Sequence, residues 1–241
     1  MKKKLGLILS VVALVFCLLN VIGFFVPTTK MDTKGTDLNV TLSSMEIAFT
    51  SKDSAAKKSA TYQSKAMAIA AEKQTEIVTE LIQSGTISSP TDPNVSVLVQ
   101  AKLLKDNKAF KSNYEKAQKY GALYQVKSDK TANLRAGFGA WAHFISLIVS
   151  VAAIVFITLN LCGLGFAWVA KILTAAAFAL AFIGAISYIA LLNTTLASLG
   201  GIKISKMFSV HAGIILGVIA TLLAACAEWL TLLPCCKKQA E

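Results

Sequence analysis

The chain has 241 residues; 55% of them are hydrophobic, only 15% are charged, and the formal net charge is +11. A soluble domain of this size carries about 25% charged residues, so the composition argues against a soluble globular protein. Eleven of the 13 acidic residues fall between Asp32 and Asp129, and 16 of the 24 basic residues lie between Lys30 and Arg135. The chain is therefore a long polar insert within a very apolar remainder.

The first predicted element is the uncharged run 5–26, which follows a basic N-terminus at 1–4. A helix needs about 20 mainly apolar residues to cross the hydrocarbon core of a bilayer, and this run is long enough. A secretory signal is the alternative, because it also combines basic residues with an apolar stretch. The run is longer than the roughly 7–15 residues of a signal core, and Phe16 before Cys17 fits a lipoprotein cleavage site poorly. We therefore predict an uncleaved span.

The polar insert follows at 27–137 and begins with two short alternating pieces. The apolar positions are in phase within each piece and shifted by one between them: Leu38, Val40 and Leu42, then Met45, Ile47 and Phe49. This pattern predicts two short strands, a short β-hairpin, or one bulged strand.

Two amphipathic helices are predicted next, over 53–83 and 95–126. In the first, one face carries Ala56, Ala60, Met67, Ala70, Val78 and Leu81. In the second, the corresponding stripe is Val99, Leu103, Phe110, Tyr114, Ala117, Gly121 and Tyr124. Two prolines and a glycine in the segment 84–94 predict a turn. The simplest assembly is an antiparallel helical hairpin.

Lysines cluster on the other side of the second helix: Lys102, Lys105, Lys108, Lys111, Lys116 and Lys119. Two interpretations stay open, a solvated helix face and a surface for an acidic extracellular partner such as an anionic glycan. Nucleic acid is not expected, because the chain has no recognised nucleic-acid-binding module. Asn39 and Asn94 match the N-glycosylation pattern.

Three further spans are predicted at 138–161, 167–192 and 209–233, with a short outer loop at 193–208 and a tail at 234–241. Lysines in the short segments lie before the first span, near the start of the third and after the fourth, which favours cytoplasmic termini. The predicted fold is an all-α integral membrane protein, a four-helix bundle with a mainly helical extracytoplasmic domain between its first two spans. The expected location is the plasma membrane or another cellular membrane.

This layout of one span, a large outer loop and three more spans resembles the claudins and related four-span membrane proteins. Claudins carry paired cysteines with a nearby tryptophan in that loop, whereas the segment from Pro27 to Arg135 has neither residue type. Tetraspanins place their large cysteine-rich loop between the third and fourth spans. The resemblance is therefore one of layout and not of motif, and it identifies no family.

The candidate functional residues among the polar residues of the predicted spans are Glu228, Asn160, His143 and His211. A carboxylate inside a membrane usually faces the bundle interior or water, and Lys171 or Asn160 would lie at the level of Glu228. Its alternative roles are a proton or cation site and a hydrogen-bonded structural residue. The two histidines are interpreted as interfacial anchors, with a pH sensor as the alternative.

Small residues predict close helix packing, within the bundle or between copies. They form a GxxxG pattern at Gly213 and Gly217 and a ridge at Ala177, Ala181 and Ala185. Cys235 and Cys236 lie next to two lysines beyond the last span and are candidates for S-palmitoylation.

The sequence contains no recognised catalytic, cofactor-binding or metal-binding motif. We therefore expect a non-enzymatic membrane protein without a cofactor, with a structural, scaffold or adhesion role at the cell surface. It would self-associate or bind another membrane protein, presenting the helical hairpin to the partner or to neighbouring copies. The alternative is a subunit of an oligomeric channel or pore, with Glu228 near the permeation path.

Overall fold

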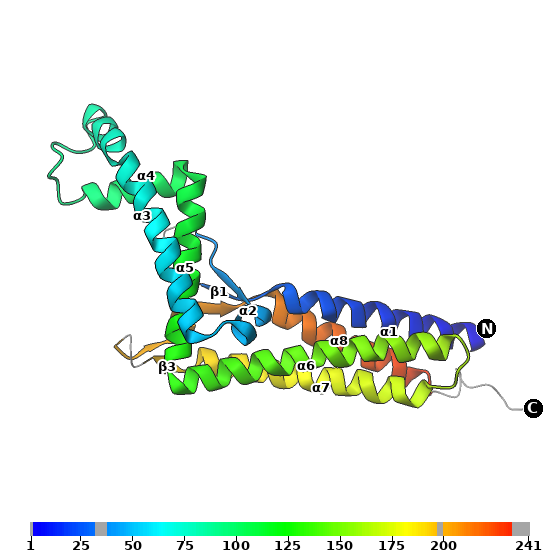
Figure 1. Cartoon of the computed structure of the whole chain (residues 1–241). Coiled ribbons are helices and arrows are strands. Elements are labelled where there is room, and N and C mark those ends of the chain that lie inside the picture. The colour runs from blue at the N-terminus through cyan, green and yellow to red at the C-terminus, as the bar shows by residue number, and fades with distance from the viewer. Residues whose placement is uncertain (1, 32–37, 197–199, 233–241) are drawn as a thin grey trace, which may run out of the picture. The chain divides into compact units, whose positions relative to one another are not determined.

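Helices dominate the computed structural model, which describes residues 2–31, 38–196 and 200–232 (Figure 1). The described residues divide into two compact units. The first combines residues up to 31, 41–49 and 129–232, and the second combines 38–40 with 50–128. The two units are described separately below.

The first unit is built on four helices: α1 (Lys2–Phe25), α6 (Lys130–Leu161), α7 (Ala167–Leu192) and α8 (Ala212–Leu230). They are the helices in the described part of the chain that are long and apolar enough to cross a membrane, which confirms the prediction of four such helices. Each packs on two neighbours in the cyclic order α1, α6, α7, α8 (Figure 1). The bounds of α7 are those predicted, whereas α6 begins eight residues earlier than expected and α8 is shorter at both ends.

The four helices bury small and polar residues and expose large apolar ones. Along α6, for example, Ser146, Ser150 and Ala153 are buried, while Trp141 and Ile148 are exposed. A soluble helix normally does the reverse, because its large apolar side chains form the core. Small residues between helices let the backbones approach closely, as in bundles that pack within lipid.

Glycines mark the closest approaches inside this bundle. A Cβ atom on Gly213 of α8 would lie 2.6 Å from the carbonyl oxygen of Val26, and one on Gly139 of α6 would lie 3.3 Å from the carbonyl oxygen of Gly184 on α7. Gly217 lies against Gly23 and Asn20 of α1. Both sides of these contacts lie within the chain, so the GxxxG pattern serves packing inside the bundle.

A small antiparallel sheet lies where α1 ends and α8 begins. It consists of β1 (Pro27–Met31), β2 (Thr41–Ser43) and β5 (Phe208–Val210), in the order β2-β1-β5, with an irregularity between Pro27 and Thr29. A two-stranded sheet pairs β3 (Thr195–Leu196) with β4 (Ile202–Lys203), followed by the 3-10 helix η2 (Ile204–Lys206). The hydroxyl of Thr28 donates to the carbonyl of Leu42 at 3.0 Å.

The strand expected at Met45, Ile47 and Phe49 is wrong, because these residues form the helix α2 (Ser44–Phe49). Ser43 and Glu46 form a reciprocal cap: the Ser43 amide donates to the Glu46 carboxylate at 3.0 Å, and the Glu46 amide donates to the Ser43 hydroxyl at 3.3 Å. A serine followed three residues later by glutamate is the capping-box signature of a helix start. This local signal outweighs an alternation of only three positions.

The second unit consists of α3 (Lys52–Gln83), α4 (Val95–Asp106) and α5 (Lys108–Ser128). The single helix expected over 95–126 is wrong, because the chain leaves helical geometry at Asn107, with φ −113° and ψ 101°. The Asn107 side chain then accepts from the Phe110 amide at 2.9 Å and caps α5. Asparagine is among the best capping residues, because its short carbonyl reaches the free amides of the next turn.

The core of this unit lies where α3 meets α4 and α5. Its buried members are Ala66, Ile77, Ile87, Val95, Val99, Leu103 and Phe110. The apolar face predicted for α3 is therefore rotated, because Met67 is 61% exposed and Ala60 is also exposed. This rotation leaves Met67 beside a cavity instead of in the core.

Candidate functional site

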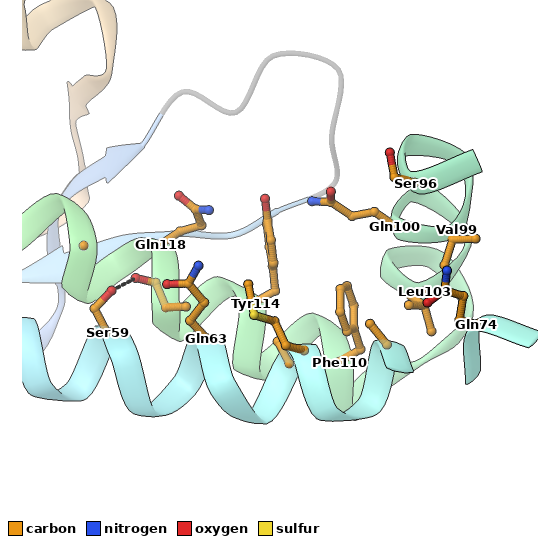
Figure 2. Close-up of a pocket in the computed structure, with 15 residues that line it drawn as sticks. Ser59, Gln63, Gln74, Ser96, Val99, Gln100, Leu103, Phe110, Tyr114 and Gln118 are labelled. Atoms are coloured by element: carbon orange, nitrogen blue, oxygen red, sulfur yellow. Dashed lines mark hydrogen bonds between the residues drawn. The ribbon is translucent and has the colours of Figure 1, made fainter. Parts of the chain in front are cut away.

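The helical unit contains a groove of about 450 Å³ bounded by α3, α4 and α5 (Figure 2). It exists because α4 and α5 diverge at Asn107, so that both contact α3 but leave space between them. A volume of this size is within the roughly 300–1,000 Å³ range of small-molecule sites.

Hydrogen-bonding side chains line the groove from all three helices. They are Ser59, Gln63, Gln74, Ser96, Gln100, Tyr114 and Gln118 (Figure 2). Each carboxamide offers both donors and an acceptor, and each hydroxyl can do either. Ser59 already donates to the carbonyl of Ala117 at 3.0 Å, which fixes α3 against α5 at one end of the groove.

Apolar and aromatic groups complete the lining. The rings of Phe110 and Tyr114 stack with centroids 5.8 Å apart and an interplanar angle of 20°. Val99 and Leu103 of α4 are buried, while Met67 of α3 is largely exposed. The groove therefore has an apolar floor and polar side chains that water can reach.

Among the described residues, none of those lining the groove is charged. Two ion pairs lie on these helices outside the lining, one between Lys102 and Glu80 and one between Lys73 and Glu76 at 2.9 Å. The hydrogen bond from Lys73 lowers the pKa of Glu76 and raises that of Lys73. Each of these two pairs is neutral overall, and the described residues that line the groove carry no charge.

A cationic surface also involves α3 and α5, and it is formed by residues that do not line the groove. Tyr62 and Tyr120 stack with centroids 5.9 Å apart and rings nearly parallel. Lys58 lies 5.0 Å from the Tyr120 ring, and Lys116 lies 5.3 Å from the Tyr62 ring. We call these four residues, with Lys65 over Tyr62, the tyrosine–lysine surface.

The six lysines predicted to form one partner face are divided between two helices, with Lys102 and Lys105 in α4 and the other four in α5. Lys102 belongs to α4 and pairs with Glu80, whereas Lys116 belongs to α5 and packs on Tyr62. The break at Asn107 interrupts the single helix on which that face was drawn, so the face stays a prediction. Lys105 and Lys108 are exposed, and Lys111 and Lys119 are half-buried.

In the bundle unit, Glu228 is buried at 1% exposure, and neither of its carboxyl oxygens has a hydrogen-bond partner in the described part of the chain. Lys171 of α7, at 4% exposure, lies within electrostatic reach of Glu228, and the hydroxyl of Ser10 on α1 lies near the carboxylate without forming a hydrogen bond of normal geometry. The Lys171 ammonium donates to the carbonyl of Ala167 at 3.4 Å and lies 5.9 Å from the Trp168 ring.

The other predicted polar residue deep in the bundle is His143, which belongs to a buried network. Its Nδ1 is 3.3 Å from the hydroxyl of Ser44, which also accepts from the Tyr188 hydroxyl at 3.1 Å. Nearby, the side chain of Asn20 donates to Ser146 and Ser150 at 3.2 and 2.8 Å. Together these groups link α1, α2, α6 and α7.

The remaining predicted residues lie apart from these groups. His211 precedes α8, where its backbone amide donates to Thr28, and Asn160 is half-buried near the end of α6. Ala177 and Ala181 are buried, Ala185 is half-buried, and Asn39 and Asn94 are exposed. Cys235 and Cys236 lie outside the described residues. Within the described ranges, no group of three or more histidine, cysteine or acidic residues is placed to hold a metal ion.

No protein-family model, curated protein or solved structure matches the chain. Sequence reasoning named several of the apolar groove residues as helix faces but missed the groove and its glutamines, although Gln63, Met67, Ala70 and Gln74 recur at helical spacing on one side of α3. Their position beside a cavity depends on the break at Asn107, which that spacing does not reveal.

Proposed function

We propose that the chain is a non-enzymatic four-span membrane protein with a scaffold or adhesion role, whose helical unit serves as an extracytoplasmic recognition module. The observation that carries the proposal is the distribution of side chains on the four apolar helices. Large apolar residues are exposed on all four, while small and polar residues are buried between them. Such a surface is costly in water and matches the hydrocarbon of a bilayer.

The recognition role is supported by two surfaces on the helical unit. The groove offers neutral hydrogen-bonding groups, and the tyrosine–lysine surface offers ammonium groups held over aromatic rings. Cation–π contacts of this kind restrain lysine side chains without removing their charge. An acidic partner, or an acidic face on a neighbouring copy, is the partner that the tyrosine–lysine surface suits.

Cysteine labelling on cells tests the membrane topology. Cys162 is exposed in the connection between α6 and α7, and the substitution Ser88→Cys adds an exposed thiol in the turn after α3. With the other cysteines replaced, an impermeant maleimide should label residue 88 on intact cells and Cys162 only after permeabilisation. Extraction of the chain by alkaline carbonate would overturn the membrane assignment, and the opposite labelling pattern would overturn the orientation.

Oligomeric mass in nanodiscs, followed by imaging, tests the role. A closed ring with a central opening would favour the channel alternative. A monomer, or an open assembly joined through the helical units, would favour recognition or scaffolding. The burial of Glu228 inside the bundle gives no support to a pore between subunits, because such a pore needs the carboxylate on an outer helix face.

A further inference from the structure

We propose that the groove between α3, α4 and α5 is a binding site for an uncharged carbohydrate of about two sugar rings. The inference rests on the proposed recognition role of the helical unit and names the ligand class. It is independent of the tyrosine–lysine surface, which shares no residue with the groove.

The first argument is electrostatic. Among the described residues, no acidic or basic side chain lines the groove, so an ionic ligand would lose hydration there without gaining a counter-charge. Transfer of an unpaired charge out of water is strongly unfavourable. A charged ligand is instead expected on the lysines elsewhere on this unit, which separates the two kinds of partner.

The second argument is the spacing and type of the polar groups. Gln63 on α3, Gln100 on α4 and Gln118 on α5 bring carboxamides to the cavity from three directions. A carboxamide presents a donor and an acceptor side by side, and a pair of neighbouring sugar hydroxyls can bond to both at once. A purely apolar ligand would instead leave these amides without partners, at a free-energy cost for each one it covers.

The third argument is the apolar floor. The stacked rings of Phe110 and Tyr114 hold the Tyr114 ring and hydroxyl in place beside the cavity (Figure 2). Sugar rings have apolar C–H faces as well as hydroxyl edges, and aromatic and thioether side chains pack on such faces. Met67, largely exposed at the groove, provides an adaptable wall for one of them.

An uncharged peptide is less well matched. Peptides are commonly bound by an exposed sheet edge or by a continuous apolar groove with anchors at helical spacing. The described part of this unit has no sheet. Its groove alternates amides with apolar groups, so a peptide helix would meet no continuous apolar stripe.

The test measures binding of three disaccharides to the full chain in lipid nanodiscs by saturation-transfer NMR. The disaccharides are N,N′-diacetylchitobiose, lactose and cellobiose. At least one of these disaccharides should bind. The double substitution Gln63→Leu with Gln118→Leu should weaken that binding at least tenfold, because it removes two of the amides and keeps the side-chain volume. The matched control is Gln83→Leu, an exposed glutamine on α3 outside the groove, which should leave binding unchanged.

A second pair of variants tests the position of the site. Ala70→Phe fills the groove and should abolish binding, while Ala71→Phe on the exposed side of α3 should not. Circular dichroism and gel filtration identify any variant that fails to fold, and the glutamine pair then decides. The inference would be overturned if none of the three disaccharides bound, or if Ala70→Phe and Ala71→Phe had equal effects on binding. It would also be overturned if the groove bound uncharged peptides and not the disaccharides. Cysteine labelling reports on the proposed function separately, so the two failures are distinguishable.

Discussion

The imidazole ring of His143 on α6 packs directly on Gly184 of α7, so closely that a side chain at residue 184 would overlap it. The same imidazole contacts the ring of Tyr188 edge-on, with centroids 5.7 Å apart. A histidine predicted to be an interfacial anchor is thus a buried part of the contact between two helices. Its neighbour across that contact has to be glycine, because no larger residue leaves room for the ring.

Gly184→Ala should therefore destabilise the bundle by about 1–3 kcal/mol, the usual cost of overpacking a core. The measurement is the thermal midpoint of the full chain in detergent, followed by gel filtration. Gly137→Ala on α6 is the matched control, since no described atom lies within 4 Å of a Cβ atom there. It should be neutral or slightly stabilising, because alanine favours a helix over glycine. Equal losses for the two variants would contradict the packing explanation.

Lys171 and Glu228 should behave as a coupled pair. Removing one member of a direct buried ion pair costs about 3–5 kcal/mol, and the loss here should be smaller, because Lys171 acts on Glu228 through an electrostatic interaction without a direct hydrogen bond. Lys171→Met and Glu228→Leu should each lower the thermal midpoint, and the double variant should lose less than the sum. A double-mutant cycle measures this difference. Strict additivity would show that the two side chains do not interact.

Asn107→Ala should weaken the start of α5 by about 1 kcal/mol, the typical value of a lost helix cap. Hydrogen exchange at the Phe110 amide reports this directly, because that amide donates to the Asn107 side chain. Asn113→Ala is the control, since Asn113 lies within α5 and bonds to the carbonyl of Ala109. Unchanged exchange at Phe110 in the Asn107 variant would disprove the cap.

Burial lowers the pKa of Lys127 near the end of α5. The unfolded chain then binds more protons than the folded one between the two pKa values, so stability rises with pH across that alkaline range. Lys127→Met should remove this rise and should be more stable than the wild type at neutral pH. Thermal midpoints at neutral and alkaline pH measure the effect, with the exposed Lys105→Met as control. A steeper alkaline rise in the Lys127 variant would reverse the assigned sign.

Several features were predictable because they depend on long runs or strong local signals. The four apolar helices follow from segments of about 20 residues, and the turn between α3 and α4 follows from its prolines and glycine. The serine–glutamate cap at Ser43 and Glu46 was also readable, but it competed with an alternating pattern in the same residues. At Asn107, one capping residue interrupts the apolar stripe that otherwise continues from α4 into α5. The helix break there was therefore not predicted.

The positions of the apolar helices, and the cysteine-free, largely helical segment between the first of them and the rest, follow directly from the amino-acid sequence. These properties follow from hydrophobicity and periodicity, which act along the chain. Which side chains come near one another depends on tertiary structure: Lys171 within electrostatic reach of Glu228, His143 against Gly184, and four glutamines around one groove. Helix rotation and the break at Asn107 set those contacts, and a change of one position in rotation moves a side chain such as Met67 from the core to the edge of a cavity.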